Sequence, residues 1–174
     1  GFLLKEAQQA LRTSSVGNVR IAGNSIRLTS SVGLLLRLAG GTNDVSYNFI
    51  DGPFQGIGII LDAAATLDLH NNAALNGFSG YRISGLGKLT ASDNLASGNS
   101  ASGFDLQTRN AVFQRNAAVR NHIGLVLQVV SPNIVENNLV TDNVLVDNGN
   151  AGITVNARGQ RIVRNDIYGN CTLF

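Results

Sequence analysis

Apolar and polar residues follow one another along this chain in a frame that returns every 22, 24 or 27 residues. In its first copy Val19, Ile21 and Ile26 surround Asn24 in the order apolar-x-apolar-x-x-Asn-x-apolar. The same frame surrounds six further asparagines: Asn48, Asn72, Asn94, Asn116, Asn138 and Asn165. The residues three before and two after each asparagine are all apolar. A short repeat of this kind predicts a solenoid, in which each repeat forms one turn and stacks on the next.

Each repeat carries a second pattern, in which a glycine precedes alternating apolar residues, as in Gly103-Phe104-Asp105-Leu106. Alternation with a period of two residues is typical of a strand with one buried face. The glycine is expected at a tight corner where the backbone φ angle is positive. We therefore predict three short strands in each turn: one before the asparagine, one after it and one after the glycine.

Leucine-rich repeats share the fragment around Asn24, so this fragment alone does not identify the solenoid. A leucine-rich repeat usually forms a helix or a helical turn in its second half, whereas this chain has glycine and strict alternation there. The pattern therefore favours strands throughout. The asparagines are expected at the corners of the turns, with their amides hydrogen-bonded along the stack and to turn backbone. A second polar column follows five residues later, at Asn99, Asn121, Asn143 and Asn170, with Gly77 in the matching position.

The N-terminal segment differs, because Leu3, Leu4, Ala7 and Leu11 form an apolar stripe at helical spacing. This stripe predicts an α-helix over residues 2–12 that caps the first turn; a helix between two domains is the alternative. The predicted organisation is a capping helix and lead-in over residues 1–17 and a parallel β-helix over residues 18–174. About seven coils are expected in this all-β fold. The frame that begins at Asn165 is expected to be an incomplete last coil, covered by further residues or by another subunit.

Composition excludes some classes of function. Charged residues make up 14% of the chain, and the 13 basic residues are scattered, with a net charge of +2. This distribution argues against a nucleic-acid partner. The longest apolar cluster, residues 32–38, is far too short to span a bilayer. Cys171 is the single cysteine, so no intrachain disulfide is possible and the cysteine count does not indicate a compartment.

Three repeats carry a likeness to a known group of proteins. They contain Asn94-x4-Asn99 with Gly103-Phe104-x-Leu106, Asn116-x4-Asn121 with Gly124-Leu125-x-Leu127, and Asn138-x4-Asn143 with Gly152-Ile153-x-Val155. Over residues 18–170 the chain resembles the right-handed parallel β-helix proteins of the pectate-lyase-like superfamily, and in particular NosD-like periplasmic proteins and alginate epimerases.

This resemblance implies a secreted, periplasmic or cell-surface protein that binds an acidic polysaccharide. It also implies that the protein processes the polysaccharide as a lyase, an epimerase or a glycoside hydrolase. The alternative is a non-catalytic structural or surface-interaction module, because one scaffold of this kind hosts unrelated functions. Neither a cofactor nor a metal site is identified by the sequence.

The motifs of those enzymes are absent. The nearest match to the Asp-Pro-His motif of alginate epimerases is Asp68-Leu69-His70, and no paired-aspartate motif of galacturonan hydrolases is present. Lyases of this architecture often use a Lys or Arg base, and the only lysines are Lys5 and Lys88. These absences count against a standard catalytic site within this chain.

Counting from the asparagines nevertheless brings candidate catalytic residues together. The positions four and two residues before the asparagine should point outward, and stacking places Asp44 beside Asp68 and Ser46 beside His70. Two adjacent carboxylates raise one another's pKa, and an imidazole can act as acid or base. Asp44, Asp68 and His70 are the predicted catalytic residues; a hydrated polar stretch of an exposed sheet is the alternative.

The strand after the glycine provides candidate binding residues. Arg82 and Asp105 fall in matching positions of adjacent coils, and Gln107 follows on the same face. Arginine pairs with the carboxylates of uronates, and aspartate or glutamine can bind hydroxyl groups. These three residues are therefore predicted to bind substrate, with a simple cross-strand ion pair as the alternative. Phe54 and Phe78, in segments between coils, are candidates for stacking on sugars.

Overall fold

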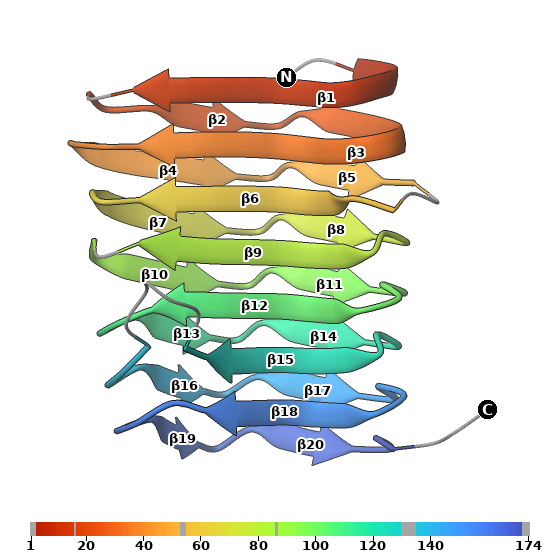
Figure 1. Cartoon of the computed structure of the whole chain (residues 1–174), viewed down its shortest axis with the longest axis vertical. Helices are drawn as coiled ribbons and strands as arrows, with labels where there is room; N and C mark the ends of the chain where they lie inside the picture. Colours follow the sequence, from red (N-terminus) through yellow and green to blue (C-terminus); the bar gives the residue numbers. More distant parts are fainter. Residues whose placement is uncertain (1–2, 16, 53–54, 86, 130–134, 172–174) are drawn as a thin grey trace.

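The structure is a computed structural model that describes residues 3–15, 17–52, 55–85, 87–129 and 135–171; of residues 3–10 and 28–30 it describes the backbone alone. The described residues form an all-β parallel solenoid of about six turns (Figure 1). The strands lie across the long axis, and the two ends of the chain lie at opposite ends of the stack. No helix of the described residues is long and apolar enough to cross a membrane.

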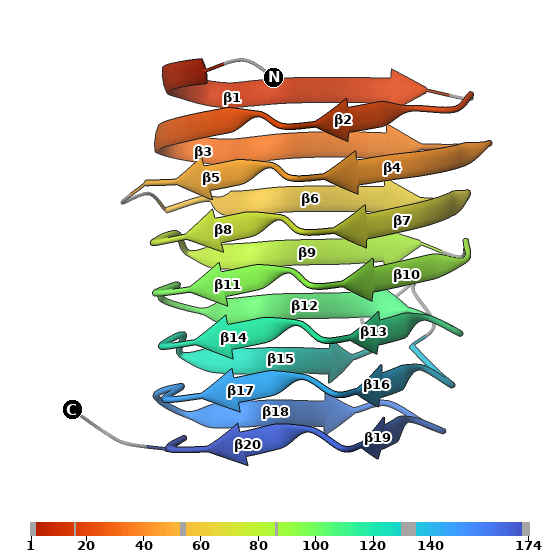
Figure 2. The same cartoon turned by 180° about the vertical axis from the view of Figure 1, so that it is seen from behind.

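Each turn contributes to three stacks of parallel strands (Figures 1 and 2). The long-strand stack contains β1 (Leu3–Ser15), β3 (Ser25–Leu38), β6 (Ile57–Ala63), β9 (Ser79–Gly85), β12 (Ser102–Thr108), β15 (Ile123–Gln128) and β18 (Ala151–Asn156). The short-strand stack contains β5 (Phe49–Asp51), β8 (Ala73–Leu75), β11 (Leu95–Ser97), β14 (Ala117–Val119), β17 (Val144–Val146) and β20 (Asp166–Tyr168). The seven-stranded sheet contains β2 (Arg20–Ala22), β4 (Thr42–Ser46), β7 (Thr66–His70), β10 (Leu89–Ser92), β13 (Val112–Gln114), β16 (Leu139–Thr141) and β19 (Arg161–Val163).

Strand β3 links the first two stacks, because its residues 25–27 pair with β5 and its residues 32–38 pair with β6.

The number of turns corrects the prediction of about seven coils. Seven strands stack in the seven-stranded sheet, and seven stacked positions enclose only six complete turns. The seven asparagine frames therefore mark the boundaries of turns rather than the turns themselves.

The predicted N-terminal helix is wrong. The described part of this segment forms β1, which pairs in parallel with β3 from Leu3 opposite Ser25 to Ser15 opposite Leu38. Residues 1–2 and 16 of the predicted cap lie outside the described residues. A helix of about eleven residues is only marginally stable by itself. The edge of β3 offers a continuous row of backbone partners instead, and Leu11 packs against the core from this strand.

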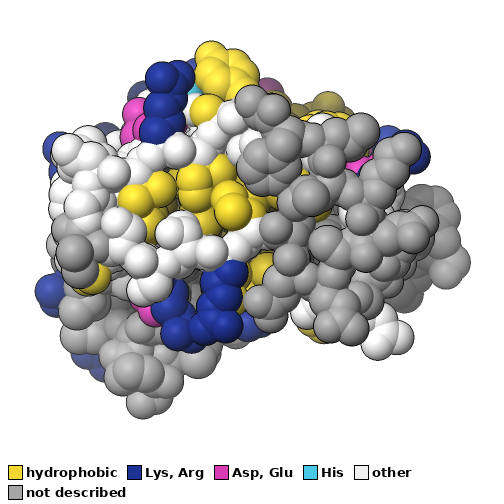
Figure 3. Space-filling view, turned by 90° about the horizontal axis from the view of Figure 1, so that it is seen from above, with side chains coloured by type: hydrophobic (Ala, Val, Ile, Leu, Met, Phe, Trp, Pro, Cys, Tyr) yellow, Lys and Arg dark blue, Asp and Glu magenta, His cyan; other side chains and the backbone are white. Residues whose placement is uncertain are grey.

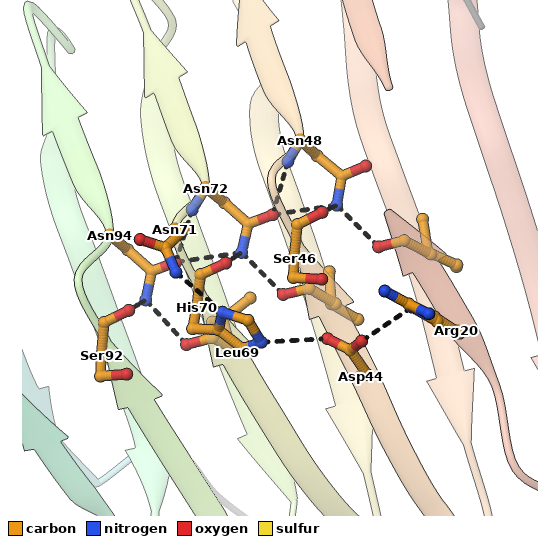
Figure 4. A network of polar contacts seen from close by, with 12 residues as sticks. Arg20, Asp44, Ser46, Asn48, Leu69, His70, Asn71, Asn72, Ser92 and Asn94 are labelled. Atoms are coloured by element: carbon orange, nitrogen blue, oxygen red, sulfur yellow. Dashed lines mark hydrogen bonds and ion pairs between the residues drawn. The ribbon is translucent and has the colours of Figure 1, made fainter. Parts of the chain in front are cut away.

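The asparagine amides at the corners form a continuous hydrogen-bonded ladder (Figure 4). In one step, both the backbone N–H and the side-chain Nδ2 of Asn72 donate to Oδ1 of Asn94, each at 3.0 Å. The same Nδ2 also donates to the backbone carbonyl oxygens of Val45 at 2.8 Å and His70 at 3.0 Å. Each amide therefore satisfies backbone groups of the turns that β-pairing leaves free.

The two ladders confirm the predicted role of the asparagines and correct their register. The first ladder runs through Asn24, Asn48, Asn72, Asn94, Asn116, Asn143 and Asn165, and the second through Asn99, Asn121, Asn148 and Asn170. Asn138 is not in the first ladder, and Asn143 is not in the second. Asn138 lies at another corner, where its amide nitrogen donates to the carbonyl oxygen of Thr108 and to Oε1 of Gln160.

The glycines at the second position of the long strands β12 and β15 are required by close packing rather than by a positive φ angle. Gly103 and Gly124 are not among the residues with positive φ. A Cβ atom added to Gly103 would lie 2.8 Å from the carbonyl oxygen of Gly124 in the next turn, closer than real Cβ atoms approach. The expectation of a positive φ at these glycines is therefore wrong, and their absent side chain lets successive turns stack.

Apolar side chains fill the space between the stacks. Tyr81 and Phe104 stack on each other with ring centroids 4.6 Å apart, and Phe104 meets Phe113 edge-on at 5.0 Å. All three rings are fully buried, and the Tyr81 hydroxyl donates to the carbonyl oxygen of Leu95. In the view along the axis, hydrophobic side chains occupy the middle of the described part and charged side chains its periphery (Figure 3).

The corner just before the first ladder carries alternating charges in its later turns. The guanidinium group of Arg115 donates two hydrogen bonds to Asp93, and that of Arg164 donates two to Asp142, all between 2.8 and 2.9 Å. Hydrogen bonds from Arg164 and Thr141 lower the pKa of Asp142 to about 2. A lowered pKa means that the Asp142–Arg164 pair stabilises the fold at neutral pH and that this contribution is lost as the pH falls through about 2.

The ladder predicts a large effect of Asn94→Ala. This change removes the partner of two donors on Asn72 and leaves the carbonyl oxygens of Leu69 and Ser92 without the amide. We expect the free energy of unfolding, measured by urea denaturation, to fall by at least about 3 kcal/mol. Asn156→Ala, at an exposed position outside both ladders, should change it by less than about 0.5 kcal/mol. Equal losses in the two variants would contradict the structural role of the ladder.

The charged corner predicts a specific titration. In Arg164→Gln, the pKa of Asp142 should rise from about 2 toward the ordinary value of about 3.9, because its main hydrogen-bond donor is lost. The carboxyl carbon chemical shift of Asp142, followed by NMR from pH 1.5 to 6, measures this change. Arg161→Gln changes an exposed arginine three residues before Arg164, at the start of β19, and should leave the pKa of Asp142 unchanged. An unchanged pKa in Arg164→Gln would show that the pair does not form in solution.

Candidate functional site

The predicted catalytic residues lie on the outer face of the seven-stranded sheet. Asp44 on β4 pairs with Asp68 on β7, and Ser46 pairs with His70, as the register arithmetic predicted. The contact that forms is diagonal, because Nε2 of His70 lies 3.3 Å from Oδ1 of Asp44. Asp68 is exposed, and within the described part of the chain it takes part in no ion pair or hydrogen bond of its side chain. The structure therefore brings Asp44 and His70 together and leaves Asp68 beside them.

Further side chains hold this pair in place (Figure 4). Nε of Arg20 lies 3.1 Å from Oδ2 of Asp44, so the carboxylate lies between a guanidinium and an imidazole. The amide nitrogen of Asn71 lies 2.9 Å from Nδ1 of His70, and the Tyr47 ring meets the imidazole edge-on at 5.6 Å. Both ring nitrogens of His70 thus have polar neighbours, which fixes the orientation of the ring.

Sequence reasoning missed Arg20 and Tyr47. Arg20 stands four residues before Asn24, in the same outward column as Asp44, so the same counting could have found it. Tyr47 had no such signal, because it occupies a corner position with a φ angle of 56° where neighbouring turns carry Gly23 and Asn71. Its ring, 61% exposed, partly covers the imidazole.

Ser46 does not complete a nucleophilic triad with His70 and Asp44. Ser46 is only 1% exposed, and its hydroxyl makes no hydrogen bond to His70 among the described residues. Its Oγ, like Oδ1 of Asp44, is buried and has no hydrogen-bond partner among the described residues. The neighbouring imidazole nitrogens face Asp44 and Asn71 instead. A hydrolytic mechanism through a serine nucleophile is therefore not supported at this position.

The predicted binding residues lie in a different place, on the outer face of the long-strand stack. Arg82 on β9 pairs in register with Asp105 on β12, and Gln107 pairs with Ser84. Nε of Arg82 lies 3.5 Å from Oδ2 of Asp105, and Nε2 of Gln107 donates to the same oxygen at 3.0 Å. The structure therefore brings all three residues together. Asp105 is 8% exposed, although its position on the strand points outward.

A hollow of about 250 Å³ opens beside Asp105 and Arg82. Its polar lining is completed by Ser79, Ser102, His122, Gln128 and Thr154, and its apolar lining by Phe78, Ala101, Ile123 and Val126. Phe78, a predicted sugar-stacking residue, is 46% exposed at this hollow, whereas Phe54 lies outside the described residues. The mixture of a few polar groups with an apolar wall is typical of small-molecule sites.

The Arg82–Asp105 ion pair at this hollow is only partly satisfied by hydrogen bonds. Burial raises the pKa of Asp105, and the hydrogen bond from Gln107 and the charge of Arg82 oppose this shift only in part. Oδ1 of Asp105 and Nε of Arg82 are both buried without a hydrogen-bond partner among the described residues. An unmatched acceptor and an unmatched donor therefore belong to two neighbouring side chains that line the hollow. Buried polar atoms are rarely left in this state.

The two clusters do not form a single site. Asp44 and His70 belong to the seven-stranded sheet, and Arg82 and Asp105 belong to the long-strand stack, which faces the other way (Figures 1 and 2). A ligand unit held in the hollow cannot present its reacting atoms to His70. Catalytic and binding residues predicted from the sequence are consequently separate features of the surface.

Comparison with known proteins gives one family. The model of the family described as periplasmic copper-binding protein (NosD) matches residues 18–173. Neither the curated proteins nor the solved structures contain a match to this chain. The family match confirms the resemblance to NosD-like proteins, and it agrees with the predicted secreted, periplasmic or cell-surface location, since the family is periplasmic.

The matched range contains all of the strands from β2 to β20, so it coincides with the solenoid rather than with one part of it. The repeated asparagine frames, the three strand stacks and this match agree with one another. The chain belongs to the NosD family of periplasmic parallel β-helix proteins.

Proposed function

We propose that this periplasmic β-helix binds a sugar unit of an acidic polysaccharide in the hollow at Asp105 and Arg82. The observation that carries the proposal is that two residues lining the hollow each hold a buried, unmatched atom, Oδ1 of Asp105 and Nε of Arg82. A hydroxyl group is both a donor and an acceptor. A single sugar hydroxyl can therefore donate to Oδ1 and accept from Nε.

The rest of the hollow fits a sugar acid. The side chain of Arg82 is 44% exposed, so the guanidinium can pair with a ligand carboxylate on its solvent side. The exposed Phe78 ring offers an apolar surface to the face of a pyranose. Ser79, Ser102 and Thr154, which carry hydroxyl groups, also line the hollow. The volume of about 250 Å³ suits one small ligand rather than a large cofactor.

The position of Asp105 works against stability, which supports a role in binding. Because its pKa is raised in the folded protein, folding favours the protonated form, and stability falls as the pH rises through the raised pKa. At neutral pH the buried carboxylate is therefore a destabilising group. Residues of this kind concentrate at functional sites, where they are kept for their chemistry.

Copper binding, which the family description names, does not fit the residues of this chain. Copper sites are built from cysteine, methionine and histidine, and the chain has one cysteine, two histidines and no methionine. His70 lies on the seven-stranded sheet, His122 at the hollow of the long-strand stack, and Cys171 is exposed near the C-terminal end. Among the described residues, no three His, Cys, Asp or Glu side chains are placed so that they could hold a metal ion.

Processing of the polysaccharide at Asp44, Asp68 and His70 is a second candidate function. It is supported by the contact between Nε2 of His70 and Oδ1 of Asp44, and by the buried Oγ of Ser46 beside it, which has no hydrogen-bond partner among the described residues. An imidazole oriented by a carboxylate is suited to proton transfer. The two ladders also support the non-catalytic structural module as an alternative, because they engage the buried asparagines entirely in the scaffold.

The binding proposal predicts opposite effects of Asp105→Asn on binding and on stability. Affinity for galacturonate oligomers, measured by isothermal titration calorimetry, should fall at least tenfold. The free energy of unfolding at pH 7 should stay the same or rise, because a destabilising charge is removed; loss of a well-satisfied buried group would instead cost about 1–3 kcal/mol. Asp166→Asn, an exposed carboxylate on β20, serves as the control and should change neither quantity. Unaltered binding in Asp105→Asn would exclude this hollow as the site.

The catalytic candidate predicts turnover that depends on the imidazole. If the protein cleaves alginate or pectate by elimination, the absorbance of unsaturated uronate should appear with the parent protein and be lost in His70→Ala and in Asp68→Asn. Asp166→Asn, which changes an exposed carboxylate on β20 outside both clusters, should retain the same rate. A rate that is unchanged in His70→Ala would remove this cluster from the catalytic candidates.

A further inference from the structure

A second hollow lies on the outer face of the long-strand stack, nearer to its N-terminal end. It has a volume of about 140 Å³ and is lined by Ser14, Arg37, Leu38, Ala39, Asp62 and Ala64. Arg37 and Asp62 are both exposed, and each lies between two buried residues of its strand, so both side chains point outward. This hollow contains neither the predicted binding residues nor the predicted catalytic residues.

The second hollow repeats the chemistry of the first. Arg37 on β3 and Asp62 on β6 are register partners in adjacent turns, just as Arg82 and Asp105 are. In the described part of the structure, neither Arg37 nor Asp62 takes part in an ion pair. An arginine and an aspartate are therefore presented together but remain available to a ligand. An arginine can bind a carboxylate of that ligand, and an aspartate can accept a hydrogen bond from one of its hydroxyls.

A row of outward polar side chains connects the two hollows. Asp62 is the register partner of Ser84, and Ser84 is the register partner of Gln107. Gln107 in turn donates a hydrogen bond to Asp105 in the first hollow. The row Arg37, Asp62, Ser84 and Gln107 thus forms one continuous polar path along the stack.

The separation of the two hollows indicates the size of the ligand. Arg37 lies on β3 and Arg82 on β9, with β6 between them, which gives about 10 Å along the axis at about 4.8 Å for each strand. Arg37 is also displaced by two residues along the strand direction, since Arg82 stands opposite Ile60 and Ile60 opposite Leu35, which adds about 7 Å sideways. Each hollow holds only a small group, so a ligand that reaches both must be a chain.

We infer that the two hollows are subsites of one extended site, which binds a linear chain of sugar acids running obliquely across β3, β6, β9 and β12. Arg82 and Asp105 hold one unit, and Arg37 and Asp62 hold a second unit further along the same chain. This inference rests on the proposed binding function and adds a second contact point, at Arg37 and Asp62, and the direction in which the polysaccharide runs across the strands. Binding at two connected subsites raises the affinity for a chain over that for either unit alone.

The test compares galacturonate oligomers of one to five units by isothermal titration calorimetry with the whole chain. Affinity should rise by at least tenfold at the length that first reaches both subsites. Arg37→Ala should remove this gain and leave the binding of a single unit in the first hollow unchanged, whereas Arg82→Ala should weaken the binding of every length. Arg161→Ala, which removes an exposed arginine on the seven-stranded sheet, is the matched control and should behave like the parent protein.

The outcomes separate this inference from the proposed function. If all lengths bind equally, and Arg37→Ala has no effect while Arg82→Ala abolishes binding, the extended site is overturned and the single hollow stands. If no oligomer binds at any length, both are overturned. Circular dichroism of each variant confirms that a loss of binding is not a loss of fold.

Discussion

The amide groups of the corner asparagines are the interaction on which the rest of the structure depends. Within a ladder, an asparagine accepts hydrogen bonds from the asparagine of one neighbouring turn and donates to the next asparagine and to backbone carbonyls, as Asn72 does toward Asn94, Val45 and His70. An amide alone supplies both an acceptor and two donors in a short side chain. The ladder therefore fixes the spacing and the register of successive turns, and it leaves the glycine column free to pack closely.

Fixed register has a direct consequence for the surface. Outward side chains from successive turns fall into straight columns, so residues 21 to 28 positions apart in the sequence become neighbours. This is why Asp44 and His70 meet on one stack and Arg82 and Asp105 on another. The ladders and the apolar core do not determine which ligand is bound. The outward side chains of each sheet determine what that face can bind.

The periodic frame was sufficient to predict the parallel β-helix and the pairing of the candidate residues. It could not resolve the shift at one turn, because Val140 fits the frame of both Asn138 and Asn143, and only the hydrogen bonds identify Asn143 as the ladder residue. The N-terminal stripe of leucines was compatible with a helix as well as with a strand. The segment forms a strand because it pairs with the edge of β3, which the pattern of its own residues does not reveal. Burial of Asp105 could not be predicted either, since column spacing does not encode what lies above the sheet.

The sequence family and the site chemistry give different kinds of information about function. The family match places the chain among periplasmic β-helix proteins, while the metal named in the family description lacks a suitable set of ligands among the described residues. The hollow at Asp105, in contrast, has a donor and an acceptor that folding leaves unmatched. A function that uses these two atoms explains why a destabilising carboxylate is present at this position.

The most direct test of sugar binding at Asp105 and Arg82 is a crystal structure of the protein with bound trigalacturonate. The expected result is a sugar hydroxyl within about 2.7–3.2 Å of both Oδ1 of Asp105 and Nε of Arg82. A ligand bound elsewhere, with both atoms hydrogen-bonded to ordered water in the same way with and without the saccharide, would contradict it.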